Sequence, residues 1–101
     1  MSEGHRNNAG KPKIHFVLEA KEALEGASRV LEYGAENYAR GNWKKGLNVT
    51  QTIDSLARHL MAYLNGEDND EESGLPHVDH VLTNALFLAT HARNPQLDDR
   101  L

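Results

Sequence analysis

Apolar side chains recur at steps of three and four residues in three separate stretches of the chain. This is the period of one face of an α-helix. The stretches run from about Leu18 to Arg40, from about Thr50 to Asn65, and from about Pro76 to Arg93. Thr50 can cap the second helix, and Pro76 is suited to the first turn of the third. The pattern therefore predicts an all-α fold with three main amphipathic helices.

Glycine and proline mark the ends and weak points of these helices. Gly66 stops the second stretch, and Asn94-Pro95 ends the third. Inside the first stretch, Gly26 and Gly34 each cost about 1 kcal/mol relative to alanine. They suggest that another backbone comes close, or that the helix bends near Gly34.

The apolar faces are wider than one neighbouring helix can cover, so a monomer would leave apolar surface exposed. We therefore expect a helical bundle completed by oligomerisation, as a homo-oligomer of two or four chains. Residues 1–13 read as an extended arm, residues 14–93 as a single helical domain, and residues 94–101 as a polar tail. A short extended segment, Ile14 to Val17, begins the domain.

Length and composition exclude several classes of protein. The 101 residues suit one domain, and 11 Lys+Arg against 15 Asp+Glu give a net charge of -4, which argues against a binder of nucleic-acid polymers. The absence of cysteine excludes disulfides, thiolate zinc sites and a cysteine nucleophile. The sequence shows no membrane span and no signal peptide, so we expect a cytoplasmic protein.

Three glutamates form a stripe on the first predicted helix. Glu25, Glu32 and Glu36 are spaced by seven and four residues, which places them along one side of the apolar face. Like charges in a row are mildly unfavourable unless a cation lies among them. The stripe is therefore either part of a cation site or a solvated face relieved by Arg29.

An acidic loop precedes the third helix and leads into a histidine-rich face. Glu67 and Asp70 come before a Ser-Gly turn, and His77, His80 and Asn84 follow at spacings that share one helical face. Oxygen ligands in this number suit Mg²⁺ or Mn²⁺ rather than zinc. A solvated charge run, with both histidines as capping or packing residues, is the alternative interpretation.

The second helix carries a further charged group. Asp54 and Arg58 lie one turn apart on the same side, with His59 beside them. They can form an intrahelical salt bridge worth about 0.3 to 0.5 kcal/mol. They can also act as a metal ligand, Asp54, with Arg58 or His59 as a phosphate contact.

Two short segments could contact a nucleotide. Lys11 and Lys13 in the arm can neutralise a polyphosphate, while Asn42 and Trp43 in the loop after the first helix can bind and stack on a base. Trp43 can equally anchor its loop to the bundle. There is no phosphate-binding glycine loop of the GxxxxGK[ST] type, so any phosphate is bound by metal and side chains.

The order of these residues resembles the phage dATP/dGTP diphosphohydrolase family. The resemblance covers roughly residues 10–90 and rests on Gly10 to Lys13, Leu31 to Tyr38, Asn42 and Trp43, Arg58 to Leu60, Gly66 to Asp68, Asp70, Glu72 to His77, His80 and Asn84. That family is similar in fold and chemistry to MazG-like all-α NTP pyrophosphohydrolases. These are helical oligomers in which carboxylates of neighbouring helices hold Mg²⁺ or Mn²⁺.

The resemblance implies hydrolysis of a purine deoxynucleoside triphosphate, dGTP or dATP, to the monophosphate and pyrophosphate in phage nucleotide metabolism, by residues 14–93 as the catalytic domain. It implies a metal-binding and catalytic set of acidic residues, namely Glu32, Glu36, Asp54, Glu67 and Asp70. It also implies substrate contacts from Lys11, Lys13, Asn42, Trp43, Arg58, His59, His77, His80 and Asn84. A carboxylate would accept the proton of the attacking water.

Two other functions are compatible with the same residues. A non-catalytic helical oligomer that binds a nucleotide, or a nucleotide-like signal, needs the lysines and the tryptophan loop but not the full carboxylate set. A structural or interaction module needs neither, because all its charges would be solvated. Metal-dependent turnover of a nucleoside triphosphate separates the enzyme from both.

Overall fold

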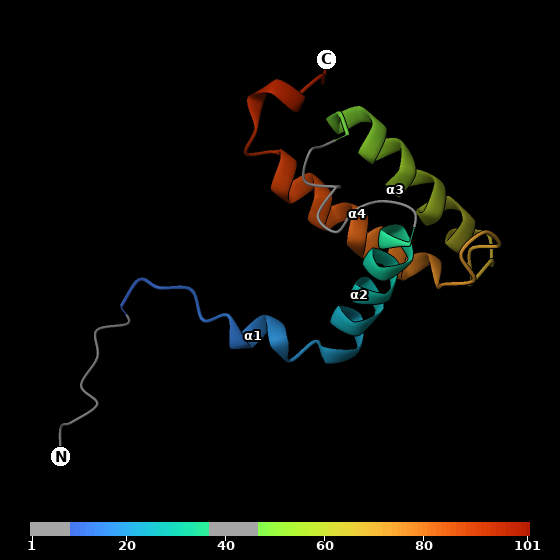
Figure 1. Cartoon of the computed structure of the whole chain (residues 1–101), viewed down its shortest axis with the longest axis horizontal. Coiled ribbons are helices and arrows are strands. Elements are labelled where there is room, and N and C mark those ends of the chain that lie inside the picture. The colour runs from blue at the N-terminus through green and yellow to red at the C-terminus, as the bar shows by residue number, and fades with distance from the viewer. Residues whose placement is uncertain (1–8, 37–46) are drawn as a thin grey trace.

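The computed structural model describes residues 9–36 and 47–101, and within these ranges the chain is helical (Figure 1). The elements are α1 (His15–Leu18), α2 (Lys21–Ala35), α3 (Val49–Leu64), α4 (His77–His91) and a 3₁₀ turn, η2 (Pro95–Leu97). The described residues contain no strand, only an isolated bridge between Asn69 and Pro76. The prediction of an all-α fold with three main helices is confirmed.

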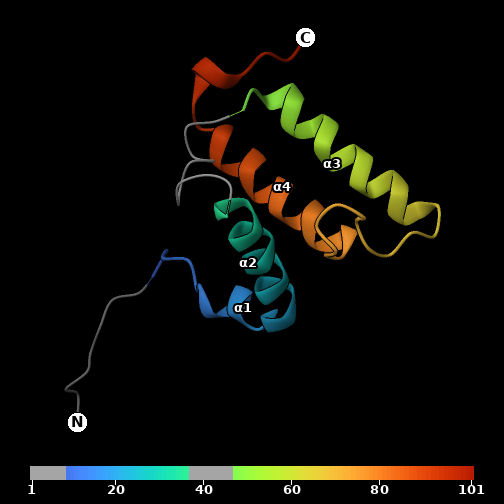
Figure 2. The same ribbon diagram turned by 45° about the vertical axis from the view of Figure 1, so that its right-hand side comes forward.

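Helix α4 lies between α2 and α3 and packs against both of them (Figure 2). Helices α3 and α4 run in opposite directions because the loop of residues 65–76 returns the chain at their shared end. Helix α2 crosses α4 on its other side. The loop and the facing surfaces of these three helices therefore meet around the start of α4.

Helix α3 begins earlier than the sequence suggested. Asn48, not Thr50, is the N-cap, and Asn48 forms a capping box with Gln51, whose Oε1 accepts the Asn48 N–H at 3.1 Å. The Thr50 N–H is bound instead by the Asp99 carboxylate at 2.9 Å. Thr50 is thus a first-turn residue. At the other end, Gly66 adopts φ 95°, as its predicted helix-stopping position requires.

The segment from Ile14 to Val17 is a turn of helix and not the extended segment expected from its composition. The N–H groups of Phe16 and Val17 donate to the carbonyls of Lys13 and Ile14, both at 3.0 Å. An extended segment needs a neighbouring strand for its hydrogen bonds, and the described chain offers none. The helical turn satisfies the same groups locally.

The first predicted helix is shorter than expected. It begins at Lys21 rather than Leu18, because the backbone of Ala20 leaves the helical region at φ -85° and ψ 54° and separates α1 from α2. Its helical residues end at Ala35, and the rest of the predicted span, as far as Arg40, lies largely outside the described residues. The helix is not broken at Gly34, which is the residue before its last one.

Gly26 does mark a close approach, although to a side chain rather than to a backbone. Gly26 is buried where α2 meets α4, and a Cβ atom built on it would collide with the carboxylate of Asp79. Nothing in the described part of the chain lies within 4 Å of a Cβ built on Gly34. Only the first of the two glycines is therefore explained by packing.

The buried interior is small and unusually polar. Ala27 and Val49 are the buried apolar residues of the described chain, whereas Thr52, His77, His80, Thr83, Asn84 and His91 are the buried polar ones. Large apolar side chains stay on the surface, including Phe16 at 61 % and Leu64 at 82 % exposure. None of the described helices is long and apolar enough to cross a bilayer.

Candidate functional site

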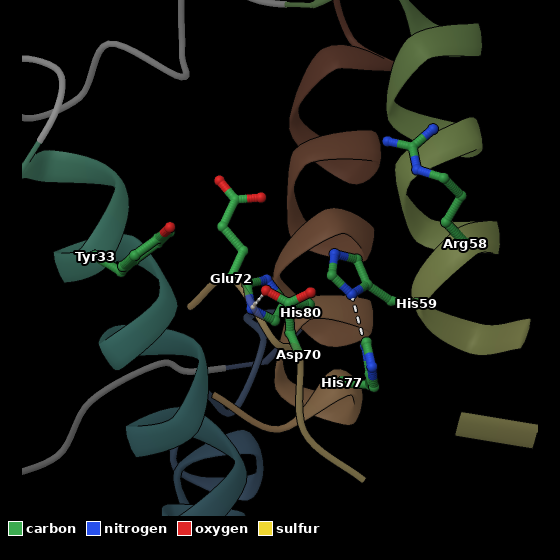
Figure 3. A pocket seen from close by; sticks show the side chains of 7 residues that line it. All are labelled: Tyr33, Arg58, His59, Asp70, Glu72, His77 and His80. Carbon is green, nitrogen blue, oxygen red and sulfur yellow. Dashed lines mark hydrogen bonds and ion pairs between the residues drawn. The ribbon is translucent and has the colours of Figure 1, made fainter. Parts of the chain in front are cut away.

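A cavity of about 330 Å³ opens where α2, α3, the start of α4 and the acidic loop meet (Figure 3). This volume is within the range of small-molecule sites. Tyr33 enters from α2, Arg58 and His59 from α3, His77 and His80 from α4, and Asp70 and Glu72 from the loop. The seven side chains come from three helices and one loop, yet all of them line one space.

Backbone hydrogen bonds hold the acidic loop in a fixed shape. The Asp70 N–H donates to the Leu75 carbonyl, and the Gly74 N–H donates to the Asp70 carbonyl, both at 2.8 Å. Gly74 has φ 74°, a backbone conformation that favours glycine. Asp70 Oδ2 accepts the Ser73 N–H at 2.9 Å. The loop therefore presents the Asp70 carboxylate to the cavity in a defined orientation.

Three histidines form the back of the cavity. His59 Nδ1 and His77 Nδ1 are 2.9 Å apart, and the rings of His59 and His80 stack at 4.2 Å with an interplanar angle of 3°. His77 Nε2 lies 3.1 Å from Glu67 Oε2, and His80 Nε2 lies 2.8 Å from Ser73 Oγ. His77 and His80 are buried. Both nitrogens of His77 thus have a defined partner.

Burial and neighbouring charges set the protonation of this group. Burial lowers the pKa of His59, and His80 lowers it further, although Asp70 acts in the opposite direction. Burial also lowers the pKa of His80. Burial alone would raise the pKa of Asp70, but hydrogen bonds from Ser73 and the nearby histidines lower it overall. At neutral pH His59 and His80 are therefore neutral and Asp70 is ionised.

The acidic side of the cavity acts on Tyr33. Burial raises the pKa of the Tyr33 phenol, and the carboxylates of Glu72 and Asp70 raise it further. Tyr33 therefore stays protonated at neutral pH and can donate a hydrogen bond. Tyr33 of α2 and Arg58 of α3 thus offer hydrogen-bond donors to the cavity from opposite sides.

A metal ion could be held by His59, Asp70 and His77. One ligand atom of each residue lies within 4.8 Å of the other two. Neutral imidazoles and an ionised carboxylate are the forms in which these side chains bind divalent metals. The residues therefore fit a divalent cation, through a mixture of nitrogen and oxygen ligands rather than through carboxylates alone.

Of the predicted acidic set, Asp70 lines the cavity, and Glu67 contacts it through His77. Glu32, Glu36 and Asp54 are exposed and do not line the cavity. Glu36 follows α2 directly and still acts electrostatically on Tyr33.

Among the predicted substrate contacts, Arg58, His59, His77 and His80 share the cavity. The described chain contains no ion pair between Asp54 and Arg58, so the simple salt bridge considered from their spacing does not form. Asn84 is buried, and its side-chain amide donates to the backbone carbonyl of His80 at 2.9 Å. This bond lies within α4, and Asn84 does not line the cavity.

The remaining predicted contacts lie away from this group or outside the described chain. Lys11 and Lys13 are exposed, and the Lys13 ammonium lies 5.7 Å from the centre of the Phe16 ring. Asn42 and Trp43 fall outside the described residues. Their expected contact with a base stays a prediction.

The site prediction left out Tyr33, Glu72 and Ser73. Ser73 bonds both Asp70 and His80, and its position three residues after an aspartate is typical of a turn closed by the aspartate side chain. That spacing could have indicated Ser73. Tyr33 and Glu72 belong to the segments that carry the family resemblance, but their spacing gave neither of them a role in the site.

The chain matches known proteins in sequence. A family model described as dATP/dGTP diphosphohydrolase, N-terminal, matches residues 1–100. A protein of Salmonella phage PMBT28 named dATP/dGTP diphosphohydrolase is 35 % identical over 77 residues, which are 75 % of this chain and 26 % of that protein. The chain thus spans about a quarter of the length of this curated relative. No solved structure matches it.

Proposed function

This chain belongs to the dATP/dGTP diphosphohydrolase N-terminal family, and from this premise we propose that its cavity binds dGTP or dATP with a divalent cation. The proposed reaction is hydrolysis to the deoxynucleoside monophosphate and pyrophosphate. Water attacks the α-phosphorus, the bond between this phosphorus and the oxygen bridging to the β-phosphate breaks, and pyrophosphate leaves.

The observation that supports this proposal best is the convergence of Arg58, three histidines and Asp70 on one cavity. The guanidinium of Arg58 suits phosphate oxygens because it is always charged and donates several hydrogen bonds. The phenol of Tyr33 adds a neutral donor across the cavity. These groups complement a polyphosphate that enters between α2 and α3.

Two carboxylates line the cavity, and they take different roles in the proposal. Asp70, with its orientation set by Ser73, is the ligand for the cation, which we expect to be Mg²⁺ or Mn²⁺. When bound, the cation neutralises phosphate charge and makes water more acidic. Glu72 lines the same cavity without a role in the metal group, so it is available to accept the proton from the attacking water.

Several predicted residues keep proposed roles that the cavity alone does not require. Glu32, Glu36 and Asp54 are proposed to bind a second cation in the presence of nucleotide, and Glu67 to orient a metal ligand through His77. Lys11 and Lys13 are proposed to cover the phosphates, and Asn42 and Trp43 to contact the base. The substitution Glu32→Gln tests this set most directly. It should abolish turnover without loss of helicity, and retained activity would remove Glu32 from the metal ligands.

A nucleotide-binding module without hydrolysis is the second candidate function. The position of Glu32, Glu36 and Asp54 outside the cavity lining favours it, because the cavity then offers binding groups but few carboxylates. The match covers 26 % of the phage relative, which is compatible with a chain that binds a nucleotide without hydrolysing it. Tight binding of dGTP without release of pyrophosphate would decide for this candidate.

We also propose that the chain acts as a homo-oligomer in the cytoplasm. Leu60, Met61 and Leu64 are exposed along the second half of α3, and Phe16 and Leu18 are exposed on α1. Apolar surface of this extent is typical of an interaction site. Light scattering at micromolar concentration should report a dimer or a tetramer.

The deciding experiment is incubation of the purified chain with each common dNTP and NTP in the presence of Mg²⁺ or Mn²⁺. Chromatography and phosphorus NMR identify the products. Deoxynucleoside monophosphate and pyrophosphate from dGTP or dATP would support the proposal. Intact nucleotide in every sample, with the folded protein present, would contradict hydrolysis by this chain.

A further inference from the structure

Two histidines of the cavity come from different helices and meet through the same type of nitrogen. His59 Nδ1 of α3 and His77 Nδ1 of α4 are 2.9 Å apart, and a ligand atom of Asp70 lies within 4.8 Å of one on each histidine. Side chains from two helices and a loop thus converge on one point. Such convergence is what a metal site requires and what a solvated charge run lacks.

The distance between the two nitrogens can be compared with that expected in two coordination geometries. Two nitrogens that are each about 2.1 Å from one ion lie about 3.0 Å apart when the angle at the ion is a right angle. At the tetrahedral angle the same two nitrogens lie about 3.4 Å apart. The observed 2.9 Å is the length of a hydrogen bond between the two nitrogens and is compatible with the first case. The donor set of two imidazoles and one carboxylate, rather than this distance, favours a six-coordinate ion over tetrahedral zinc.

A second layer of contacts orients the ligands. His77 Nε2 lies 3.1 Å from Glu67 Oε2, so an Nε2–H that donates to Glu67 leaves the lone pair of Nδ1 free to face an ion. The Asp70 carboxylate is held by the Ser73 N–H, and the His59 ring is held by stacking on His80. Carboxylates that bond the far nitrogen of a ligating histidine are typical of metal sites.

His80 belongs to this supporting layer and not to the ligands. Its Nε2 is 2.8 Å from Ser73 Oγ and 3.9 Å from Asp70 Oδ2. Ser73 thus links His80 to the Asp70 turn. The three ligands are in this way supported by Glu67 and Ser73 of the loop and by His80 of α4.

From this geometry we propose that His59, Asp70 and His77 bind one six-coordinate transition-metal ion, such as Mn²⁺, Fe²⁺ or Co²⁺, in preference to Mg²⁺, and that Glu67 is a positioning residue. Two imidazoles and one carboxylate on one side of an ion form a recognised site for such metals. Mg²⁺ prefers oxygen ligands and keeps its water. The site stands independently of nucleotide hydrolysis, although it deepens that proposal if both hold.

The test measures metal binding in the absence of nucleotide. The purified full chain is stripped with EDTA and titrated with Mn²⁺, Co²⁺, Zn²⁺ and Mg²⁺ by calorimetry, and the visible spectrum of the Co²⁺ form is recorded. We expect saturation at a single ion per chain, weak six-coordinate Co²⁺ bands, and binding of Mg²⁺ weaker by about tenfold or more. Intense four-coordinate bands, or equal affinity for Mg²⁺, would overturn the proposal.

Variants distinguish the loss of a metal ligand from the loss of the fold. Asp70→Asn and His59→Gln should abolish saturable Co²⁺ binding, and Glu67→Gln should weaken it by about 10 to 100-fold. His15→Gln, on the exposed helix α1, is the matched control and should bind as the parent does. Circular dichroism in EDTA shows whether each variant folds.

The outcomes are distinguishable from those of the nucleotide assay. Because Glu67 is half-exposed, its variant should remain folded even if the others do not. Unchanged affinity in folded Glu67→Gln and Asp70→Asn would refute the site. Metal binding without turnover would contradict only hydrolysis, and turnover without saturable Mn²⁺ or Co²⁺ binding would contradict only this site.

Discussion

The contact between Gly26 and Asp79 makes the packing of α2 on α4 open to a direct test. A Cβ atom on Gly26 would collide with the Asp79 carboxylate, whereas one on Gly34 would meet nothing within 4 Å in the described chain. Both glycines lie in the same helix, so Gly26→Ala and Gly34→Ala change the backbone propensity in the same direction. The two substitutions differ mainly in whether the added methyl group meets a side chain of α4.

The expected changes in the free energy of unfolding follow from helix propensity and from the contact with Asp79. In Gly34→Ala, alanine replaces glycine in a helix and should raise the free energy of unfolding by up to about 1 kcal/mol. In Gly26→Ala the same gain is opposed by displacement of Asp79, since overpacking costs about 1 to 3 kcal/mol. The two variants should therefore differ by about 1 to 3 kcal/mol, which is roughly 5 to 20 °C in melting temperature for a domain of this size.

Thermal and urea unfolding at one protein concentration measure this difference. The double variant Gly26→Ala with Asp79→Ala supplies the control, because the truncated side chain no longer occupies the space. In that background the alanine should become stabilising, as it is at position 34. If Gly26→Ala alone stabilised the protein as much as Gly34→Ala, then α2 would not approach α4 as described.

Three further predictions concern the tail, the cavity and the surface. Asp99 accepts hydrogen bonds from the N–H and hydroxyl of Thr50, and these bonds lower the pKa of Asp99 from 3.8. The stability that these bonds contribute is thus present above about pH 4 and is lost on acidification. Between about pH 5 and pH 3, the free energy of unfolding measured in urea should therefore fall more steeply for the parent than for Asp99→Asn. An equal fall in both proteins would argue against the contact. Arg58→Ala should weaken dGTP binding by about tenfold in calorimetry with little change in melting temperature, and unchanged affinity would remove Arg58 from the phosphate contacts. Leu64→Glu should shift light scattering toward the monomer, since Leu64 is 82 % exposed; an unchanged oligomer would place the interface elsewhere.

Part of the candidate site could be predicted from the sequence because it depends on one helix. His77 and His80 are three residues apart, so any helix through them places both on the same side, and both do line the cavity. Asn84 shares their face but is buried against its own helix, bonded to the His80 carbonyl. Spacing thus gave the direction of each side chain but not the partner it meets.

Other parts depended on how the helices pack. Glu32 and Tyr33 are neighbours on α2, yet Tyr33 lines the cavity and Glu32 does not, because α4 lies on one side of that helix only. Asp54 and Arg58 are one turn apart on α3, and Arg58 alone reaches the space. A rotation of a helix by part of a turn would exchange such residues. The sequence pattern does not determine that rotation when the apolar face is wide.

What the sequence by itself determined is the set of helices and where they stop. Periodic apolar residues, a helix-stopping Gly66 and the Asn94-Pro95 pair act locally, through backbone conformation and nearest neighbours. The tertiary structure alone decided that His59 of α3 meets His77 of α4 beside Asp70 of the loop. That meeting depends on the register of two antiparallel helices. Register is set by side-chain packing between distant segments, about which the period of either helix carries no information.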